Sequence, residues 1–400
     1  MTLKQSSSSI RKPVYLDYAA TTPVAPQVAA AMAECLTLEG NFANPASRSH
    51  LLGWQAEEAV ETARAQVADL IDADPREIVW TSGATEANNL ALKGVAEHHR
   101  LSGKTGGHIV VSAIEHKAVL DPAGWLEQQG FAVTRVQPNN EGVIELDAIS
   151  AAFRDDTFLV SIMHANNELG SINDIRAVAE MCHARGILVH CDAAQSAGKI
   201  DVNVKELGVD LLSLSAHKFY GPKGVGALYV RRAADVKVVA QIHGGGHERN
   251  MRSGTLATHQ CVGMGVAAEL ARASMAEDRE RISSLRDLLW SGISDLPHVV
   301  RNGSSSACVS GILNVAFASD ASQGCDGEAL LLSLRDIAIS SGSACNSASM
   351  SPSYVLKAIG LSDAQAQASL RLSVGRYTTR EEIEFAIEHI RSVVAKLKKA

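Results

Sequence analysis

Two polar side chains follow apolar runs of the sequence, and together they could hold a pyridine ring. Asp192 ends the run that begins at Ile187, and Lys218 comes directly after the run that ends at Ser215. A lysine amine can form a Schiff base with an aldehyde, and a carboxylate can keep a pyridine nitrogen protonated. The pair therefore predicts a pyridoxal phosphate (PLP) site, although a lone Lys or Asp is more often a solvated surface group.

A phosphate-binding segment is predicted where Ser82-Gly83-Ala84-Thr85-Glu86 joins a strand to a helix. Backbone N–H groups and the positive end of the helix dipole attract an anion there, and Thr85 adds a hydroxyl donor. An ordinary helix N-cap is the alternative interpretation of this segment alone. Ser215 and His217 flank Lys218 and could also donate to the phosphate.

Three further residues carry candidate chemistry. His116 follows a predicted strand, where an imidazole can stack on a flat cofactor and move protons near neutral pH. Cys345 lies in a stretch rich in Ser, Gly and Ala, which leaves a sulfur accessible as a nucleophilic thiolate. Arg371 can bind a carboxylate through two hydrogen bonds. The structural alternatives are a core histidine, a small core cysteine and a surface ion pair.

Alternating strands and helices must position these residues. From residue 75 to 232, short β-rich runs alternate with helix-like segments, which predicts a mostly parallel sheet covered on both faces. In such sheets, ligands bind beyond the carboxyl ends of the strands. Five successive strand ends carry small, polar or titratable residues, so we expect a site at that edge. The predicted strands are Ile78–Ser82, His108–Ile114, Phe158–His164, Ile187–Asp192, Leu211–Ser215 and Ala227–Arg231.

The sequence pattern changes after about residue 270. Long helical segments, Ala271–Ile293 and Arg380–Lys399, flank short strands near Gly311–Phe317, Ala338–Ser341 and Arg371–Gly375, which predicts a smaller α+β domain. We expect a disordered tail over residues 1–13, a large domain over 17–270, and a small domain formed by 14–16 and 271–400. The small domain would carry the cysteine loop at about 340–350.

Composition excludes several classes of protein. Hydrophobic residues make up 46% and charged residues 20% of the chain, as in globular proteins. The net charge of −7 gives no basic excess for nucleic acid or an anionic membrane surface, and no apolar run reaches transmembrane length. Seven scattered cysteines argue against a disulfide framework and indicate a reducing cytoplasm. No metal site is expected, because three glycines separate His243 from His247 and prevent a helix.

The motifs together resemble a known family, the cysteine desulfurases of the NifS/IscS type. The similarity is closest to the IscS branch, within the class V aminotransferase-like PLP enzymes, and runs from Val14 to the last helix. It implies PLP fold type I, an α/β fold with a mostly parallel, seven-stranded-type sheet between helices and a smaller α+β domain. The matching motifs are Asn44-Pro45-Ala46-Ser47, Thr81-Ser82-Gly83-Ala84-Thr85-Glu86, Glu115-His116-Lys117, His164-Ala165-Asn166-Asn167-Glu168, Asp192-Ala193-Ala194-Gln195-Ser196, Ser215-Ala216-His217-Lys218, Gly244-Gly245-Gly246-His247-Glu248-Arg249, Arg252-Ser253-Gly254-Thr255, Ser341-Gly342-Ser343-Ala344-Cys345 and Arg371-Leu372-Ser373.

The resemblance implies a role for each cofactor-binding residue. Lys218 forms the Schiff base with PLP, and Asp192 pairs with the pyridine nitrogen. Gln195 reaches the ring hydroxyl, His116 stacks on the ring, and Asn167 lies near the ring oxygen and the substrate. The residues implied to hold the phosphate are Ala84, Thr85, Ser215, His217 and, from the second subunit of a homodimer, Thr255.

The implied reaction converts L-cysteine to L-alanine. Arg371 binds the substrate carboxylate, the freed Lys218 amine or His116 moves protons, and Cys345 attacks the substrate sulfur and keeps it as a persulfide. The sulfur then passes to an acceptor protein, for iron–sulfur cluster assembly or tRNA thiolation. We expect a cytoplasmic homodimer. Relatives of the IscS branch carry a C-terminal tail that docks scaffold proteins, and this sequence stops at Ala400, so the resemblance leaves scaffold docking open.

Two alternatives share parts of this pattern. A selenocysteine lyase or an aminotransferase could use the same fold, but Cys345 on a long loop favours a desulfurase, because aminotransferases need no thiol. A non-catalytic partner subunit would be indicated by loss of Lys218 or Asp192, and the sequence retains both.

Overall fold

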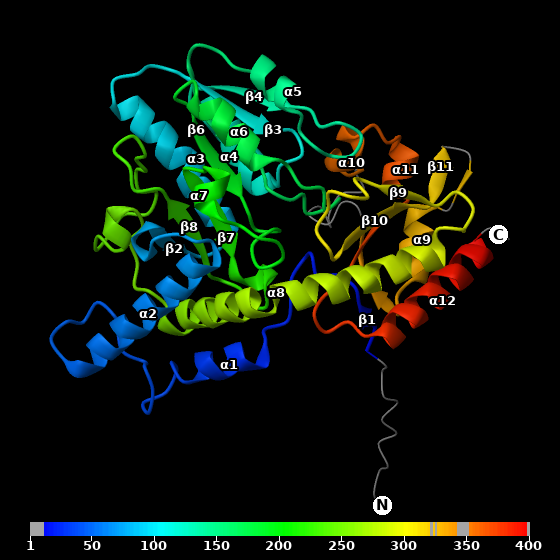
Figure 1. The fold of residues 1–400 in the computed structure, drawn as a ribbon, viewed down its shortest axis with the longest axis horizontal. Coiled ribbons are helices and arrows are strands. Elements are labelled where there is room, and N and C mark those ends of the chain that lie inside the picture. The colour runs from blue at the N-terminus through cyan, green and yellow to red at the C-terminus, as the bar shows by residue number, and fades with distance from the viewer. Residues whose placement is uncertain (1–11, 321–322, 325, 342–351, 398–400) are drawn as a thin grey trace, which may run out of the picture.

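A seven-stranded sheet forms the centre of the larger part of the protein (Figure 1). The computed structural model describes residues 12–320, 323–324, 326–341 and 352–397. The strand order is β2-β8-β7-β6-β5-β3-β4, and β8 alone in this sheet runs antiparallel to its neighbours. The strands are β2 (Ile78–Thr81), β3 (His108–Ser112), β4 (Ala132–Val136), β5 (Thr157–Ser161), β6 (Leu188–Asp192), β7 (Leu211–Ser215) and β8 (Gly226–Val230).

Successive side chains of these strands enter two separate cores, one on each face of the sheet. Ile78 and Trp80 belong to one core, whereas Val79 between them belongs to the other. The first core packs against α2 (Leu51–Leu70), α6 (Ile175–His183) and α8 (Thr258–Ile293). The second packs against α3 (Ala84–Leu101) and α4 (Lys117–Gln128). Covering both faces is what buries a mostly parallel sheet.

The predicted fold class is confirmed, but some predicted strand bounds are wrong. The strands expected to reach Ile114 and His164 end at Ser112 and Ser161. Past the first of these ends, the Ser112 hydroxyl accepts a hydrogen bond from the Ile114 backbone N–H, which turns the chain. Strand β4 was not predicted, because it lies at the sheet edge, where its partly exposed residues lack a clear apolar pattern.

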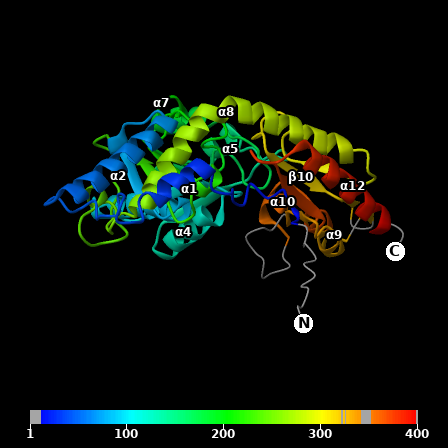
Figure 2. The same cartoon turned by 90° about the horizontal axis from the view of Figure 1, so that it is seen from below.

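A second, antiparallel sheet of order β14-β15-β10-β9 lies beside the first region. Its apolar face packs against the C-terminal half of α8 and against α12 (Arg380–Leu397). Figure 2 shows these two helices next to each other, close to β10. Its strands are β9 (Val300–Asn302), β10 (Ile312–Ala316), β14 (Ser340–Ser341) and β15 (Ser369–Ser373). Near the N-terminus, β1 (Val14–Tyr15) pairs with β13 (Ile337–Ala338) beside this sheet.

Helix α8 connects the two regions. It begins at Thr258, earlier than the predicted Ala271, and runs without interruption from the first core to that of the second sheet. The predicted domain bounds stay a prediction, and residues 1–11 and 342–351 lie outside the described part. The other elements are α1 (Pro26–Ala33), α5 (Leu146–Ala151), α7 (Val204–Leu207), α9 (Gly327–Ser333), α10 (Tyr354–Ala358), α11 (Asp363–Gln367), β11 (Ala318–Asp320), β12 (Gln323–Gly324) and the 3-10 turns Pro75–Glu77, Ala216–Lys218 and Glu248–Asn250.

Candidate active site

The carboxyl ends of the parallel strands open onto a cavity of about 480 Å³. Residues from both sheets line this cavity, because Arg371 of β15 reaches it from the smaller sheet. Within the described part of the chain, every predicted site residue except Thr255 lines it. The lining residues predicted from the sequence are Ala84, Thr85, His116, Asn167, Asp192, Gln195, Ser215, His217, Lys218 and Arg371.

Asp192 ends β6, where its carboxylate is buried and held by two donors. Its Oδ2 accepts a hydrogen bond of 2.7 Å from Asn88 Nδ2, and its Oδ1 accepts one of 2.9 Å from the Ala194 backbone N–H. Both donors are uncharged, so the carboxylate keeps its negative charge available to a ligand in the cavity. The arrangement can hold a cationic ring nitrogen.

Lys218 comes just after β7, in the short 3-10 turn. Its Nζ donates to the backbone oxygens of Ala19 and Ala20, at 2.8 and 2.9 Å. The Ala19 oxygen also accepts a hydrogen bond of 2.8 Å from Gln195 Nε2, so the two nitrogens converge on one carbonyl. Lys218 and Asp192 line the same cavity, so the amine can reach a ligand that also contacts Asp192.

His116 is the N-cap of α4. Its Nδ1 accepts a hydrogen bond of 3.1 Å from the Ala118 backbone N–H, so the neutral ring carries its proton on Nε2. Burial lowers the pKa of this imidazole, and the charge of Asp192 partly opposes that effect. His116 is therefore neutral at neutral pH, can stack on a ring, and has an Nε2–H group that can donate a hydrogen bond.

The anion-binding end of the cavity is the N-terminus of α3. Gly83 caps this helix with a φ of 148° and has no side chain to occupy the cap. The backbone of Gly226 lies close by, because a Cβ added there would approach Gly83 Cα to 2.6 Å. Burial lowers the pKa of nearby His217 to about 4, so this imidazole is neutral and bonds to Thr21 Oγ1 through Nδ1.

Arg371 closes the cavity from β15. Its Nη1 donates to the Asn167 backbone oxygen at 2.9 Å, and its Nη2 donates to Asp17 Oδ1 at 2.9 Å and to Ser340 Oγ at 3.1 Å. Two buried polar atoms beside these bonds, Arg371 Nε and Asn167 Oδ1, have no hydrogen-bond partner among the described residues. Because buried polar atoms are normally hydrogen-bonded, these two atoms suit a polar ligand that would bond to them.

Comparison with known proteins identifies one family for this chain. The family described as "Aminotransferase class-V" matches residues 14–385. Cysteine desulfurase IscS of Tolumonas auensis is 58% identical to this chain over 389 residues, which cover 97% of this chain and 94% of that protein. IscS of Shewanella sp. (strain ANA-3) is 57% identical with the same coverage. This chain belongs to the cysteine desulfurases of the IscS type.

Solved structures support the same family. A NifS-like protein superposes with a TM-score of 0.87 at 36% identity, over 96% of this chain and 100% of that one. A structure described as SspA in complex with cysteine gives 0.80 at 41% identity, over 92% and 100%. The class V aminotransferases and the cysteine desulfurases are PLP-dependent families. No helix in the described ranges of this desulfurase is long and apolar enough to cross a membrane.

Among the described residues of the desulfurase, one predicted site residue, Thr255, does not line the cavity. Thr255 is exposed and lies outside the lining of its own chain's cavity. Cys345 lies outside the described residues. Two described serines lie on either side of Cys345 in the sequence. Ser340 donates a hydrogen bond to Asp17 Oδ1 at 2.8 Å, and Ser353 donates one to Glu168 Oε2 at 2.6 Å.

Two polar residues near the strand ends of the desulfurase, Glu115 and Asn166, accept hydrogen bonds from the protein backbone. Glu115 accepts a hydrogen bond of 2.6 Å from the Met163 backbone N–H, and burial raises the pKa of its carboxyl well above the ordinary value. Asn166 Oδ1 accepts from the backbone N–H groups of Glu168 and Leu169 and so forms a turn. These side chains shape the strand ends that carry His116 and Asn167.

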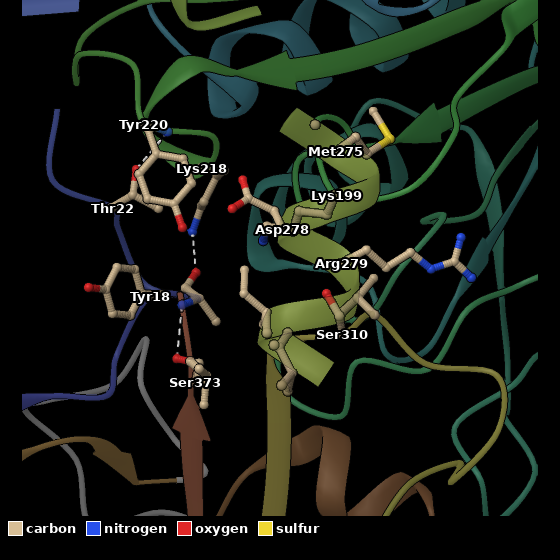
Figure 3. Close-up of a pocket in the computed structure, with 17 residues that line it drawn as sticks. Tyr18, Thr22, Lys199, Lys218, Tyr220, Met275, Asp278, Arg279, Ser310 and Ser373 are labelled. Atoms are coloured by element: carbon tan, nitrogen blue, oxygen red, sulfur yellow. Dashed lines mark hydrogen bonds between the residues drawn. The ribbon is translucent and has the colours of Figure 1, made fainter. Parts of the chain in front are cut away.

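A second, smaller cavity of about 40 Å³ lies behind the first and shares Ala19 and Lys218 with it. Figure 3 shows Tyr18 and Tyr220 on one side of it, and Lys199 with Asp278 of α8 on the other. The sequence analysis missed Lys199 and Asn88. The available signal was spacing: Asn88 lies one helical turn after Ala84 on α3, and Lys199 lies four residues after Gln195.

Proposed function

We propose that this protein is a PLP-dependent cysteine desulfurase that converts L-cysteine to L-alanine and passes the sulfur to Cys345 as a persulfide. The observation that carries the proposal is the convergence of the Lys218 amine and the Asp192 carboxylate on one cavity. Membership of the IscS-type family supports the choice of substrate.

The residues that line the cavity fit PLP in three ways. The Asp192 carboxylate is oriented by Asn88 and Ala194 and suits a protonated pyridine nitrogen. The N-terminus of α3, capped by a glycine, suits the phosphate. Asn167 Oδ1 is a buried oxygen without a partner among the described residues, as a ring or substrate group would require.

PLP, when bound, withdraws electrons from the α-carbon of the amino acid attached to it. Asp192 would keep the proton on the pyridine nitrogen, which sustains that withdrawal. Lys218 would hold the cofactor aldehyde until the substrate amine replaces it, and its freed amine or the neutral imidazole of His116 would then move the α-proton. Gln195 and Asn167 would orient the ring through its hydroxyl oxygen.

The phosphate would be held by hydroxyl, imidazole and backbone donors. Ala84 and Thr85 supply the start of α3, and Ser215 and His217 lie opposite at the end of β7. Thr255 is exposed on its own subunit, which suits donation to the phosphate in the second subunit of a homodimer.

Arg371 would bind the carboxylate of L-cysteine, since its guanidinium lines the cavity and its Nε has no partner among the described residues. The Cys345 thiolate would attack the substrate sulfur and form an S–S bond as the C–S bond breaks. The electron pair of the broken bond stays on carbon, which takes up a proton and becomes the methyl group of alanine.

The persulfide would then pass to an acceptor protein for iron–sulfur cluster assembly or tRNA thiolation. The described cysteines Cys35, Cys182, Cys191, Cys261 and Cys308 are free thiols, which supports a reducing cytoplasm as the place of action.

The test is turnover of the PLP-reconstituted protein with L-cysteine, with alanine and protein-bound persulfide measured together. Cys345→Ala should abolish the persulfide, whereas Cys308→Ala, at a partly exposed cysteine outside the cavity, should keep both products. Wild-type levels of persulfide in Cys345→Ala would refute the role of that residue. Wild-type protein that makes no alanine would refute the desulfurase activity.

A further inference from the structure

Lys199 lies directly behind Gln195, outside the main cavity. Its Nζ donates to Gln195 Oε1 at 2.6 Å. Gln195 lines the main cavity. Lys199 lines the smaller cavity, which shares Lys218 with the main one, and Figure 3 labels both lysines. Lys199 therefore reaches a ligand in the main cavity through Gln195 rather than by direct contact.

The two hydrogen bonds of Gln195 determine which way its amide faces. An ammonium can only donate, so the amide oxygen must face Lys199. A backbone oxygen can only accept, so the amide nitrogen must face Ala19. Because Lys218 Nζ donates to the same Ala19 oxygen, the Gln195 N–H donor lies beside the reacting amine.

Lys199 carries its charge in an unusual setting. Among the described residues, no carboxylate forms an ion pair with Lys199. Within the same residues, its ammonium forms one hydrogen bond, to the neutral side-chain amide of Gln195. Burial, together with the charges of Lys218 and Arg371, lowers the pKa of this amine to about 7. The titratable groups around the small cavity are Tyr18, Lys218, Tyr220, Asp278 and Arg279. Asp278 bonds to Arg376 at 2.8 Å, so its charge is already paired.

A partly buried ammonium without a carboxylate partner costs free energy unless another anion shares its surroundings. The proposed cofactor brings such an anion, its ring oxygen, to the side of the cavity that Gln195 lines. We propose that Lys199 is a positioning residue, which locks the Gln195 amide so that the second N–H of its nitrogen, the one not bonded to Ala19, faces the ring oxygen of PLP, and which adds a positive charge behind that amide. This inference depends on the proposed PLP-dependent function.

The experiment follows the visible absorption band of the PLP-reconstituted protein as a function of pH. A cation and a hydrogen-bond donor beside the ring oxygen both favour loss of the chromophore proton. Lys199→Met should therefore raise the apparent pKa of the band by about one unit. Lys199→Arg keeps the charge and should restore most of the wild-type value. Lys205→Met, at an exposed lysine of α7, is the matched control and should leave the band unchanged.

The coupling to Gln195 has its own readout. If Lys199 acts through Gln195, adding Lys199→Met to Gln195→Ala should shift the pKa of the band by much less than it does in wild type. Equal shifts in both backgrounds, or an unshifted band in Lys199→Met, would overturn the inference. Lys199→Gln replaces the ammonium by a neutral amide and gives the same expected shift if the methionine variant does not fold.

The failure of this inference is distinguishable from failure of the proposed function. Wild-type protein that forms no visible band with PLP would refute the proposed cofactor. A normal wild-type band that Lys199→Met leaves unshifted would refute only the role of Lys199.

Discussion

Asn88 on α3 donates its side-chain amide to Asp192 at the end of β6, over 2.7 Å and in a fully buried setting. The bond joins the helix whose N-terminus faces the proposed phosphate site to the carboxylate proposed to hold the pyridine nitrogen. The Asn88 Oδ1 atom has no partner among the described residues, so this side chain acts there through its amide N–H donor alone.

Replacing Asn88 with Ala should weaken PLP binding while the fold is retained. Loss of a hydrogen bond to a buried charged group costs about 1–3 kcal/mol, which corresponds to roughly a tenfold to hundredfold loss of affinity. Equilibrium titration of the apoprotein with PLP measures the effect. Asn89→Ala is the control, because the Asn89 amide bonds to the Thr85 backbone oxygen and to no other described residue, so this substitution should change affinity little. Equal affinity in both variants would contradict the role of Asn88.

Replacing Arg371 with Lys should raise the KM for L-cysteine. Lysine keeps the charge but loses the forked donor geometry, so we expect kcat/KM to fall by about tenfold to a hundredfold. The affinity for PLP should stay near wild type, because Arg371 is proposed to bind the substrate alone. Initial rates of alanine formation across cysteine concentrations test this, with the exposed Arg380→Lys as control. An unchanged KM in Arg371→Lys would exclude this residue as the carboxylate ligand.

The buried carboxyl of Glu168 should make the stability of the protein depend on pH. Burial raises the pKa of its carboxyl from 4.5 to about 7. Between these pH values the folded state therefore binds more protons than the unfolded state. The contribution of the Glu168 carboxyl to stability falls as pH rises from about 4.5 to 7. Glu168→Gln cannot ionise, so it should gain stability relative to wild type on going from pH 5 to pH 8, by roughly 1–3 kcal/mol.

The measurement for Glu168 is the apparent unfolding midpoint of both proteins at several pH values. Glu141→Gln, at an exposed carboxylate, is the control and should show no such trend. A difference between wild type and Glu168→Gln that is constant across pH would show that the carboxyl does not titrate in this range.

Replacing Gly226 with Ala should disturb the phosphate end of the cavity. The added Cβ would lie 2.4 Å from the Leu214 backbone oxygen and 2.6 Å from Gly83 Cα, so the backbone must move. Overpacking of this kind costs about 1–3 kcal/mol, and PLP affinity should fall with stability. Gly124→Ala, inside α4 where the nearest atom is 3.8 Å away, should be tolerated. A fully stable Gly226→Ala protein with normal PLP affinity would refute the steric interpretation.

The sequence by itself determined the position of the site along the sheet. Apolar runs that end in Asp192 and near Lys218 predict buried strands, and parallel strands bring their carboxyl ends to one edge. Hydrophobic periodicity and chain order are local properties, so they could be interpreted without coordinates. For the same reason the ordered motifs indicated the family and the residues that line the main cavity.

Only the tertiary structure decided how the site residues are supported. Asn88 meets Asp192, and Arg371 meets Asp17, across long stretches of chain, and no local pattern specifies such pairs. The unbroken course of α8 and the edge strand β4 were also missed, because burial by distant segments outweighs local propensity there. Lys199 acquires its place behind Gln195 in the same way. A turn places Lys199 against the oxygen of the Gln195 amide, and the nitrogen of that amide is held by Ala19, which lies 176 residues earlier in the chain.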